Sequence, residues 1–161
     1  MKNINITREN VHWLVGFLDQ FEKPRFVLGH WKEKPTSSAE GLWQNSPTIE
    51  AFIMGFYERG LFVEFHWMKW EYGKKLWQEP ERIYRVNGLT CLKLLTMHLR
   101  ADHFTPGHFR TVFEEGQITI ILQRLKVLLG NQGGNAFQQG RSVPAGRPSR
   151  KIALDYEIIG D

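Results

Sequence analysis

The clearest hydrophobic pattern lies between residues 89 and 129, where the spacing of apolar positions predicts three consecutive helices. The third is the best defined, because its apolar residues recur at i, i+3, i+4 and i+7 and share one helical face. These residues are Ile118, Ile121, Leu122, Leu125, Leu128 and Leu129. Gly116 is expected to end the helix before it, and Gly130 ends this one. We expect the rest of the chain to pack against these three helices.

Capping residues predict where the first two of these helices begin. Asn87 can accept a hydrogen bond from a backbone N–H of the first turn of a helix that is apolar on nearly its whole circumference and therefore buried. The polar residues 100–103 are expected to end it. Thr105 and Pro106 then predict the start of the next helix, as its N-cap and its first helical residue.

Three further helices are predicted upstream. Thr7 is the expected N-cap of the first, whose apolar stripe continues to Phe21, and Ser46 caps the second, immediately before a proline. Residues 67–80 form the third, because their tryptophans share roughly one helical face. These tryptophans are Trp67, Trp70 and Trp77.

Extended structure is predicted only in short pieces. Residues 25–31 and 61–65 are apolar and aromatic enough to form short strands or extended segments, whereas residues 32–45 are polar and predict a mobile loop. The sequence therefore predicts a mainly α fold, a compact bundle of about five helices with a minor short-stranded β element. An α+β fold is the alternative.

The character of the chain changes after residue 130. Residues 1–130 are predicted to form a single helical domain, residues 131–150 a flexible linker rich in Gly, Gln and Pro, and residues 151–161 a C-terminal strand or docking segment. Apolar residues in this last segment alternate with the others, as in a strand: Ile152, Leu154, Tyr156 and Ile158. A strand needs a partner, which is either the extended piece near Phe26 or another copy of the chain in a homo-oligomer.

Composition narrows the class of protein. The chain is 42% hydrophobic and 24% charged, which is typical of a globular protein and excludes a disordered chain. The net charge of +4 is weak evidence for nucleic-acid binding, because residues 1–130 hold 17 basic and 14 acidic side chains that are scattered rather than clustered. The single Cys91 rules out an intramolecular disulfide. With no signal-peptide or membrane-span pattern, we expect a cytoplasmic location and no membrane partner.

One cluster has the residue types of a catalytic site. His98 and Asp102 are four residues apart and share a helix face, and His103 and His108 follow, so the four could bind a divalent metal in a hydrolase or nuclease. In the structural alternative, Asp102 caps a turn and Arg100 pairs with a carboxylate such as Glu114. No nucleophile motif or phosphate-binding loop accompanies the cluster, and we expect no cofactor.

Residues 94–125 resemble a family motif. The pattern runs Leu-Leu-Thr, Arg-x-Asp-x-Phe, Gly, Phe-x-x-Gly and Arg-Leu, and is similar to the core of a bacterial family of uncharacterised proteins, domain of unknown function 6508. The matching residues are Leu94, Leu95, Thr96, Arg100, Asp102, Phe104, Gly107, Phe113, Gly116, Arg124 and Leu125. His103 stands where the family usually has Arg. The resemblance covers about residues 10–130, and it implies no activity, since none is established for the family.

The function that we predict from the sequence is a non-enzymatic binding or interaction module for an anionic or protein ligand. Its expected site is a groove in which Arg100 anchors an anionic group and tryptophan rings stack on the ligand. The predicted groove consists of Trp67, Trp70, Arg100, Asp102, His103 and His108. The metal-dependent hydrolase or nuclease using His98, Asp102, His103 and His108 is the alternative.

Overall fold

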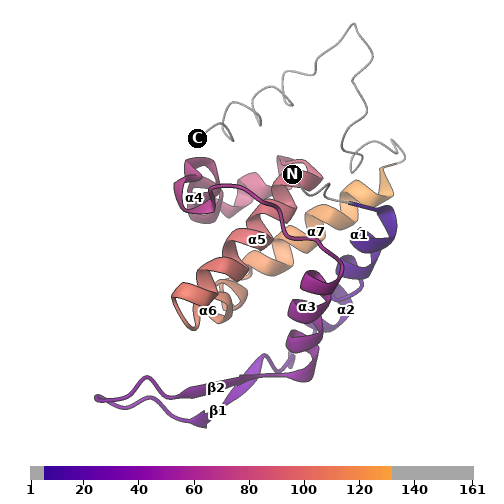
Figure 1. Cartoon of the computed structure of the whole chain (residues 1–161). Helices are drawn as coiled ribbons and strands as arrows, with labels where there is room; N and C mark the ends of the chain where they lie inside the picture. Colours follow the sequence, from indigo (N-terminus) through magenta and orange to yellow (C-terminus); the bar gives the residue numbers. More distant parts are fainter. Residues whose placement is uncertain (1–5, 132–161) are drawn as a thin grey trace, which may run out of the picture.

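The structure is a computed structural model that describes residues 6–131. Within these residues, seven α-helices and two 3-10 helices surround a core, and one two-stranded antiparallel sheet extends from it (Figure 1). In chain order the elements are α1 (Arg8–Val15), α2 (Leu18–Phe21), β1 (Gly29–Glu33), β2 (Leu42–Asn45), α3 (Pro47–Glu58), η1 (Trp67–Lys69), α4 (Glu71–Gln78), η2 (Pro80–Arg85), α5 (Gly88–Phe104), α6 (His108–Glu114) and α7 (Gln117–Gly130). The prediction of a mainly α fold with a minor β element is confirmed.

Helix α5, the first of the three helices predicted as the centre of the fold, is buried along most of its length. Every residue from Thr90 to Leu99 is buried, and the Asn87 side chain accepts a hydrogen bond from the Thr90 N–H at 2.8 Å, which confirms the predicted N-cap. Helix α7 packs against both α5 and α1 (Figure 1). The Arg124 guanidinium fixes this arrangement by donating a hydrogen bond to the Val86 carbonyl at 2.7 Å, just before α5 begins.

The predicted junction between α5 and α6 is wrong by several residues. Helix α5 continues through the polar residues 100–103 to Phe104, and α6 starts at His108 rather than at Pro106. The cause is a long-range cap: the Asp102 carboxylate accepts the Phe109 N–H at 2.9 Å, and Gly107 makes the reversal with φ +90°. Asp102 therefore caps the N-terminus of α6, which is the role predicted for Thr105.

Two of the predicted upstream helices are divided. Thr7 caps α1 as predicted, but a tight turn at Gly16 and Phe17 separates α1 from α2. The helix predicted over residues 67–80 is wrong, because Trp70 has ψ +84° and interrupts it between η1 and α4. Trp70 is consequently 3% exposed whereas Trp77 is 37% exposed, so the tryptophans do not share one helical face.

The predicted loop over residues 32–45 is also wrong, because it contains most of a β-hairpin. Strand β1 begins at Gly29, later than the predicted extended segment, and pairs with β2 so that Trp31 lies opposite Trp43, with ring centroids 5.2 Å apart. Figure 1 shows this hairpin projecting from the helical body beside α3. Residues 61–65 form no strand, and the Val63 N–H instead donates to the Thr96 hydroxyl on α5 at 3.1 Å.

The predicted linker beyond Asn131 and the predicted C-terminal strand lie outside the described residues. None of the helices in the described part of the chain combines the length and the hydrophobicity needed to cross a membrane.

Candidate functional site

The structure divides the predicted groove between the interior and the surface. Trp70 is buried in the core against Phe65, with ring centroids 5.2 Å apart, and His108, which is partly buried, contacts the buried His98. Trp67, Arg100 and His103 remain partly or fully accessible. The six residues are therefore not brought together in one place.

The interior part is a pair of histidines. His98 Nδ1 and His108 Nε2 lie 3.0 Å apart, so one nitrogen donates a hydrogen bond to the other, and the rings are stacked. The Trp77 indole meets both rings edge-on, at centroid distances of 5.9 and 5.1 Å. Burial, with a smaller contribution from His108, lowers the pKa of His98 to about 3. Burial also lowers the pKa of His108, against the opposing influence of Asp102 and Glu115. Both imidazoles are consequently neutral at pH 7.

The four residues of the metal alternative do not form a ligand set. His98 Nδ1 is engaged by His108, Asp102 caps α6, and His103 is exposed with its ring edge against Phe104. Throughout residues 6–131, no group of three or more His, Cys, Asp or Glu side chains is placed to hold a metal ion. Cys91 is fully buried, and burial raises the pKa of its thiol to about 12, so it is not an activated nucleophile.

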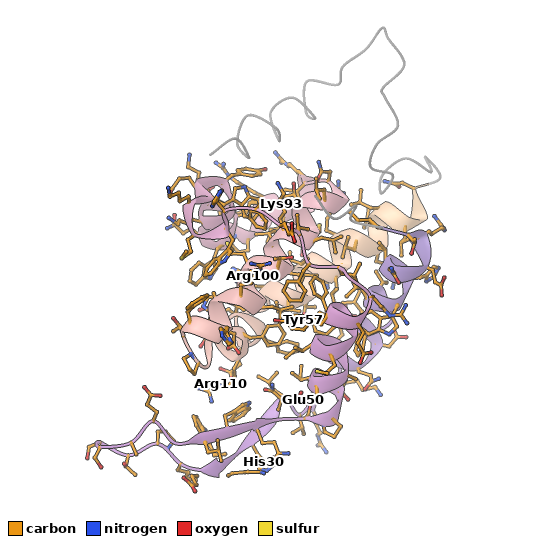
Figure 2. All side chains as sticks on the ribbon, viewed as in Figure 1. His30, Glu50, Tyr57, Lys93, Arg100 and Arg110 are labelled. Carbon is orange, nitrogen blue, oxygen red and sulfur yellow. The ribbon has the colours of Figure 1, made fainter. Side chains whose placement is uncertain are left out.

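The surface part joins side chains from four segments into what we call the aromatic strip. It consists of Tyr57 on α3, Phe62 on the connection between α3 and η1, Trp67 at the start of η1, and Arg100 and Phe104 on α5. The Tyr57 and Phe62 rings stack with centroids 4.0 Å apart, and the Arg100 guanidinium lies 5.8 Å from the Phe62 centroid. Phe104 is four residues after Arg100, on the same side of α5, and its centroid is 5.9 Å from that of Trp67. Figure 2 labels Tyr57 and Arg100 close together between α3 and α5.

The aromatic strip presents apolar surface beside a positive charge. Phe104 is 70% exposed and Tyr57 54% exposed, and the neighbouring Met68 is 66% exposed. Two ion pairs form among residues 6–131, Lys74 with Glu71 and Arg82 with Glu79, and neither involves Arg100. The pairing of Arg100 with Glu114 that the structural alternative predicts is therefore not formed. Arg100 instead lies over an aromatic ring.

The site predicted from the sequence did not include Tyr57, Phe62 and Phe104. The spacing of Arg100 and Phe104 is a local signal that could have placed both on one helix face. Tyr57 and Phe62 flank the turn at Gly60, which has φ +64°, and this close spacing around a glycine could have suggested their stacking. Their position over α5 depends on tertiary packing and has no local signal.

A second cation, Arg110, joins the hairpin to the helical body. Its guanidinium carbon is 4.6 Å from the ring centroids of both Trp31 and Trp43, and Trp43 Nε1 donates to the Asn45 side chain at 3.0 Å. Figure 2 shows Arg110 on α6, on the side that faces the hairpin. A cation shared by two indoles is held by the negative faces of their π systems.

We expect Arg110→Met to loosen the hairpin. Methionine keeps the length of the side chain and removes the charge, so the free energy of unfolding should fall by about 1 kcal/mol. The β1 amides should exchange with deuterium faster in the variant, as measured by mass spectrometry. Lys126→Met, at an exposed position on α7, is the matched control and should leave exchange in the hairpin unchanged. Equal exchange in all three proteins would show that the Arg110 contact does not hold the hairpin.

The comparison with protein-family models gives a match over most of the chain. The model of a family of unknown function, DUF6508, matches residues 6–131. The chain belongs to this family. The DUF6508 match includes every described helix and the hairpin, and it confirms the family resemblance of residues 94–125. Searches of curated proteins and of solved structures gave no match.

Proposed function

We propose that this DUF6508 domain is a binding module, and that its aromatic strip receives an apolar, acidic segment of a partner protein. The observation that carries the proposal is the position of Arg100, which forms no ion pair within residues 6–131 and lies beside exposed aromatic rings. A carboxylate of the partner would accept hydrogen bonds from Arg100, while the rings of Tyr57 and Phe104 would cover apolar side chains.

The residue types of the aromatic strip suit this role. Arginine and large aromatic residues contribute most of the binding energy at protein interfaces, because they combine a large contact area with directed polar groups. Complete burial of an exposed phenylalanine is worth about 1.5–3 kcal/mol. A hydrogen bond between an arginine and a carboxylate is roughly twice as strong as one between neutral groups.

The residues of the family motif within positions 94–125 have two kinds of role in this structure, and the difference supports the proposal. Thr96 accepts a hydrogen bond from Val63, Asp102 caps α6, and Gly107 and Gly116 have φ of +90° and +83°. Each of these residues has a role in folding. Arg100 and Phe104 differ, because both lie at the surface and neither forms a hydrogen bond that fixes an element.

The hydrolase alternative is less well supported. Two of the polar atoms that it requires already have partners: Asp102 Oδ1 accepts the Phe109 N–H, and His98 Nδ1 pairs with His108 Nε2. Of the six residues of the predicted groove, the aromatic strip contains Trp67 and Arg100, and His103 lies next to it against Phe104. Trp70, Asp102 and His108 are given structural roles instead.

Selection from a phage-displayed library of random twelve-residue peptides, with the full-length chain immobilised, tests the proposal. We expect enriched peptides that contain an acidic residue next to apolar or aromatic residues. In calorimetric titrations, Arg100→Gln and Phe104→Ala should each weaken binding of a selected peptide about tenfold, which corresponds to about 1.4 kcal/mol. The control is Val127→Ala, since Val127 is 52% exposed on α7, a helix that contributes no residue to the aromatic strip.

Two results would contradict the proposal. One is a selection that enriches no peptide over a parallel selection with the Arg100→Gln/Phe104→Ala double variant. The other is an unchanged dissociation constant in both single variants. Circular dichroism and urea unfolding of each variant would show that its fold is intact, because surface substitutions of this kind rarely change stability strongly.

A further inference from the structure

The connection between α3 and η1 has the burial pattern of an extended segment that lies on α5. Leu61 and Val63 are buried, whereas Phe62 is half-buried and Glu64 is exposed. This period of two is that of a strand with one face on the core. The Val63 N–H donates to the Thr96 hydroxyl at 3.1 Å, which holds the segment against α5. Figure 1 shows the connection crossing α5 on its way from α3 to α4.

One edge of this segment carries backbone groups that no other described residue uses. In extended backbone, the N–H and C=O groups of successive residues point to opposite edges, so those of Phe62 and Glu64 share the edge that is turned away from the Val63 N–H. Among residues 6–131, none forms a hydrogen bond with the N–H or C=O of Phe62 or Glu64. The edge therefore offers two donors and two acceptors to a further strand.

We propose that the partner segment binds in an extended conformation, as a strand added to the edge formed by Phe62 and Glu64. This inference rests on the proposed function and adds to it the backbone conformation of the partner. In recognition by strand addition, main-chain hydrogen bonds give affinity and alternate side chains give specificity. Phe62 also belongs to the aromatic strip, and the Arg100 guanidinium carbon is 5.8 Å from the centroid of its ring. The unused edge and the charged aromatic surface are therefore continuous.

The two edge residues favour different side chains in the partner. Opposite charges on neighbouring strands stabilise their pairing, and like charges directly opposite each other destabilise it. Arg100, beside Phe62, favours an acidic side chain at the partner residue opposite Phe62. The exposed carboxylate of Glu64 disfavours an acidic side chain two residues away in the partner. We therefore expect the acidic residue at one end of the paired stretch and an uncharged or basic residue at the other.

Backbone N-methylation of a peptide selected on the full-length chain tests the extended pairing. A methyl group on a peptide nitrogen removes the N–H that a paired strand donates. In calorimetric titrations, we expect single N-methyl groups at two positions, two residues apart, to weaken binding about tenfold each. An N-methyl group at the residue between them should change the dissociation constant less than about threefold, because that N–H points away from the protein.

The outcomes separate this inference from the proposed function. Equal losses at all three neighbouring positions, or no loss at any position, would overturn the extended pairing. If binding of the same peptides were still weakened by Arg100→Gln, the proposed function would stand without it. Failure to select any peptide whose binding depends on Arg100 would contradict both.

Substitution of Glu64 tests the same pairing from the side of the protein. Glu64→Pro removes the backbone N–H at an edge position where proline is tolerated, whereas the matched control Glu64→Ala keeps it. We expect Glu64→Pro to weaken peptide binding about tenfold and Glu64→Ala to bind as tightly as the unchanged chain or more tightly. Amide exchange by NMR on the unchanged chain should show the Phe62 and Glu64 amides exchanging about tenfold more slowly with saturating peptide. Equal binding by the two Glu64 variants, or exchange of both amides unaltered by the peptide, would also overturn the inference.

Discussion

Lowering the pH from 7.5 to 4.5 should reduce the free energy of unfolding by about 3 kcal/mol through His98 alone. In the unfolded chain this imidazole has its ordinary pKa of 6.5, whereas in the folded protein burial holds its pKa at about 3. Between these values the unfolded state binds a proton that the folded state does not bind. Stability is therefore fully present above pH 6.5 and is lost as the pH falls towards 3, by about 1.4 kcal/mol for each pH unit.

Urea unfolding followed by tryptophan fluorescence at several pH values would measure this loss. Carboxylates also take up protons in acid, so the informative quantity is the difference between the unchanged protein and His98→Phe. Phenylalanine retains an aromatic ring against Trp77 and cannot titrate. We expect the variant to lose about 3 kcal/mol less than the unchanged protein between pH 7.5 and 4.5. His12→Gln, at an exposed histidine, is the matched control and should follow the unchanged protein. Parallel losses in the unchanged protein and His98→Phe would show that His98 titrates normally in the folded state.

The same property bears on function. A histidine whose pKa is about 3 is neutral at pH 7, and the Nδ1 of His98 is already engaged by His108. General acid–base catalysis is most efficient when the pKa of the catalytic group is near the working pH. His98 is therefore better suited to packing than to catalysis, and this favours the binding proposal over the hydrolase alternative.

Elements that depend on local signals were predictable from the sequence. Thr7, Ser46 and Asn87 each accept a backbone hydrogen bond from the residue three positions later, so these helix starts depend on a few neighbouring residues. Helix α7 was predicted within a residue or two at each end, because its apolar face continues over the full length of the helix. Local capping and periodicity were sufficient to predict where these helices begin and, for α7, where the helix ends.

Elements that depend on distant contacts were not predictable. Trp31 and Trp43 are separated by a mostly polar stretch, and Arg110, whose guanidinium contacts both rings, lies on α6, far from them in the sequence. At the start of α6, the local signal from Thr105 and Pro106 was outweighed by the Asp102 carboxylate, seven residues before the amide that it caps. Tertiary contacts determine the structure of both regions, the hairpin and the start of α6.

The predicted groove depended on the continuity of one helix. Had residues 67–80 formed a single helix, Trp67 and Trp70 would have lain on one side together. The interruption at Trp70 places its ring in the core, over Gly73, where an added Cβ would lie 2.1 Å from the indole. Trp67 instead packs against Phe104 at the surface. The choice of Arg100 as the residue that would anchor an anionic group could be made from its residue type. The aromatic neighbours of Arg100 could not be predicted.

Replacing Phe52 by alanine should cost about 3–5 kcal/mol of stability, the range for a buried phenylalanine that leaves a cavity. Phe52 is fully buried on α3, and its ring contacts four others whose centroids are 5.2–6.5 Å away. These rings belong to Trp13, Phe17, Phe21 and Phe109. One side chain thus joins α3 to α1, α2 and α6, and truncating it removes contacts that the surrounding helices cannot all recover by relaxing.

Met54→Ala is the matched control for this prediction, because Met54 is on the same helix and 52% exposed. Urea unfolding at pH 7.5 should show a shift of less than about 1 kcal/mol for Met54→Ala. A Phe52→Ala protein as stable as Met54→Ala would show that the aromatic cluster is not what holds α3 in place. Helix α3 also carries Tyr57, so its attachment through Phe52 determines where one end of the aromatic strip lies. Loss of that attachment should weaken peptide binding even though Phe52 itself is inaccessible to any ligand.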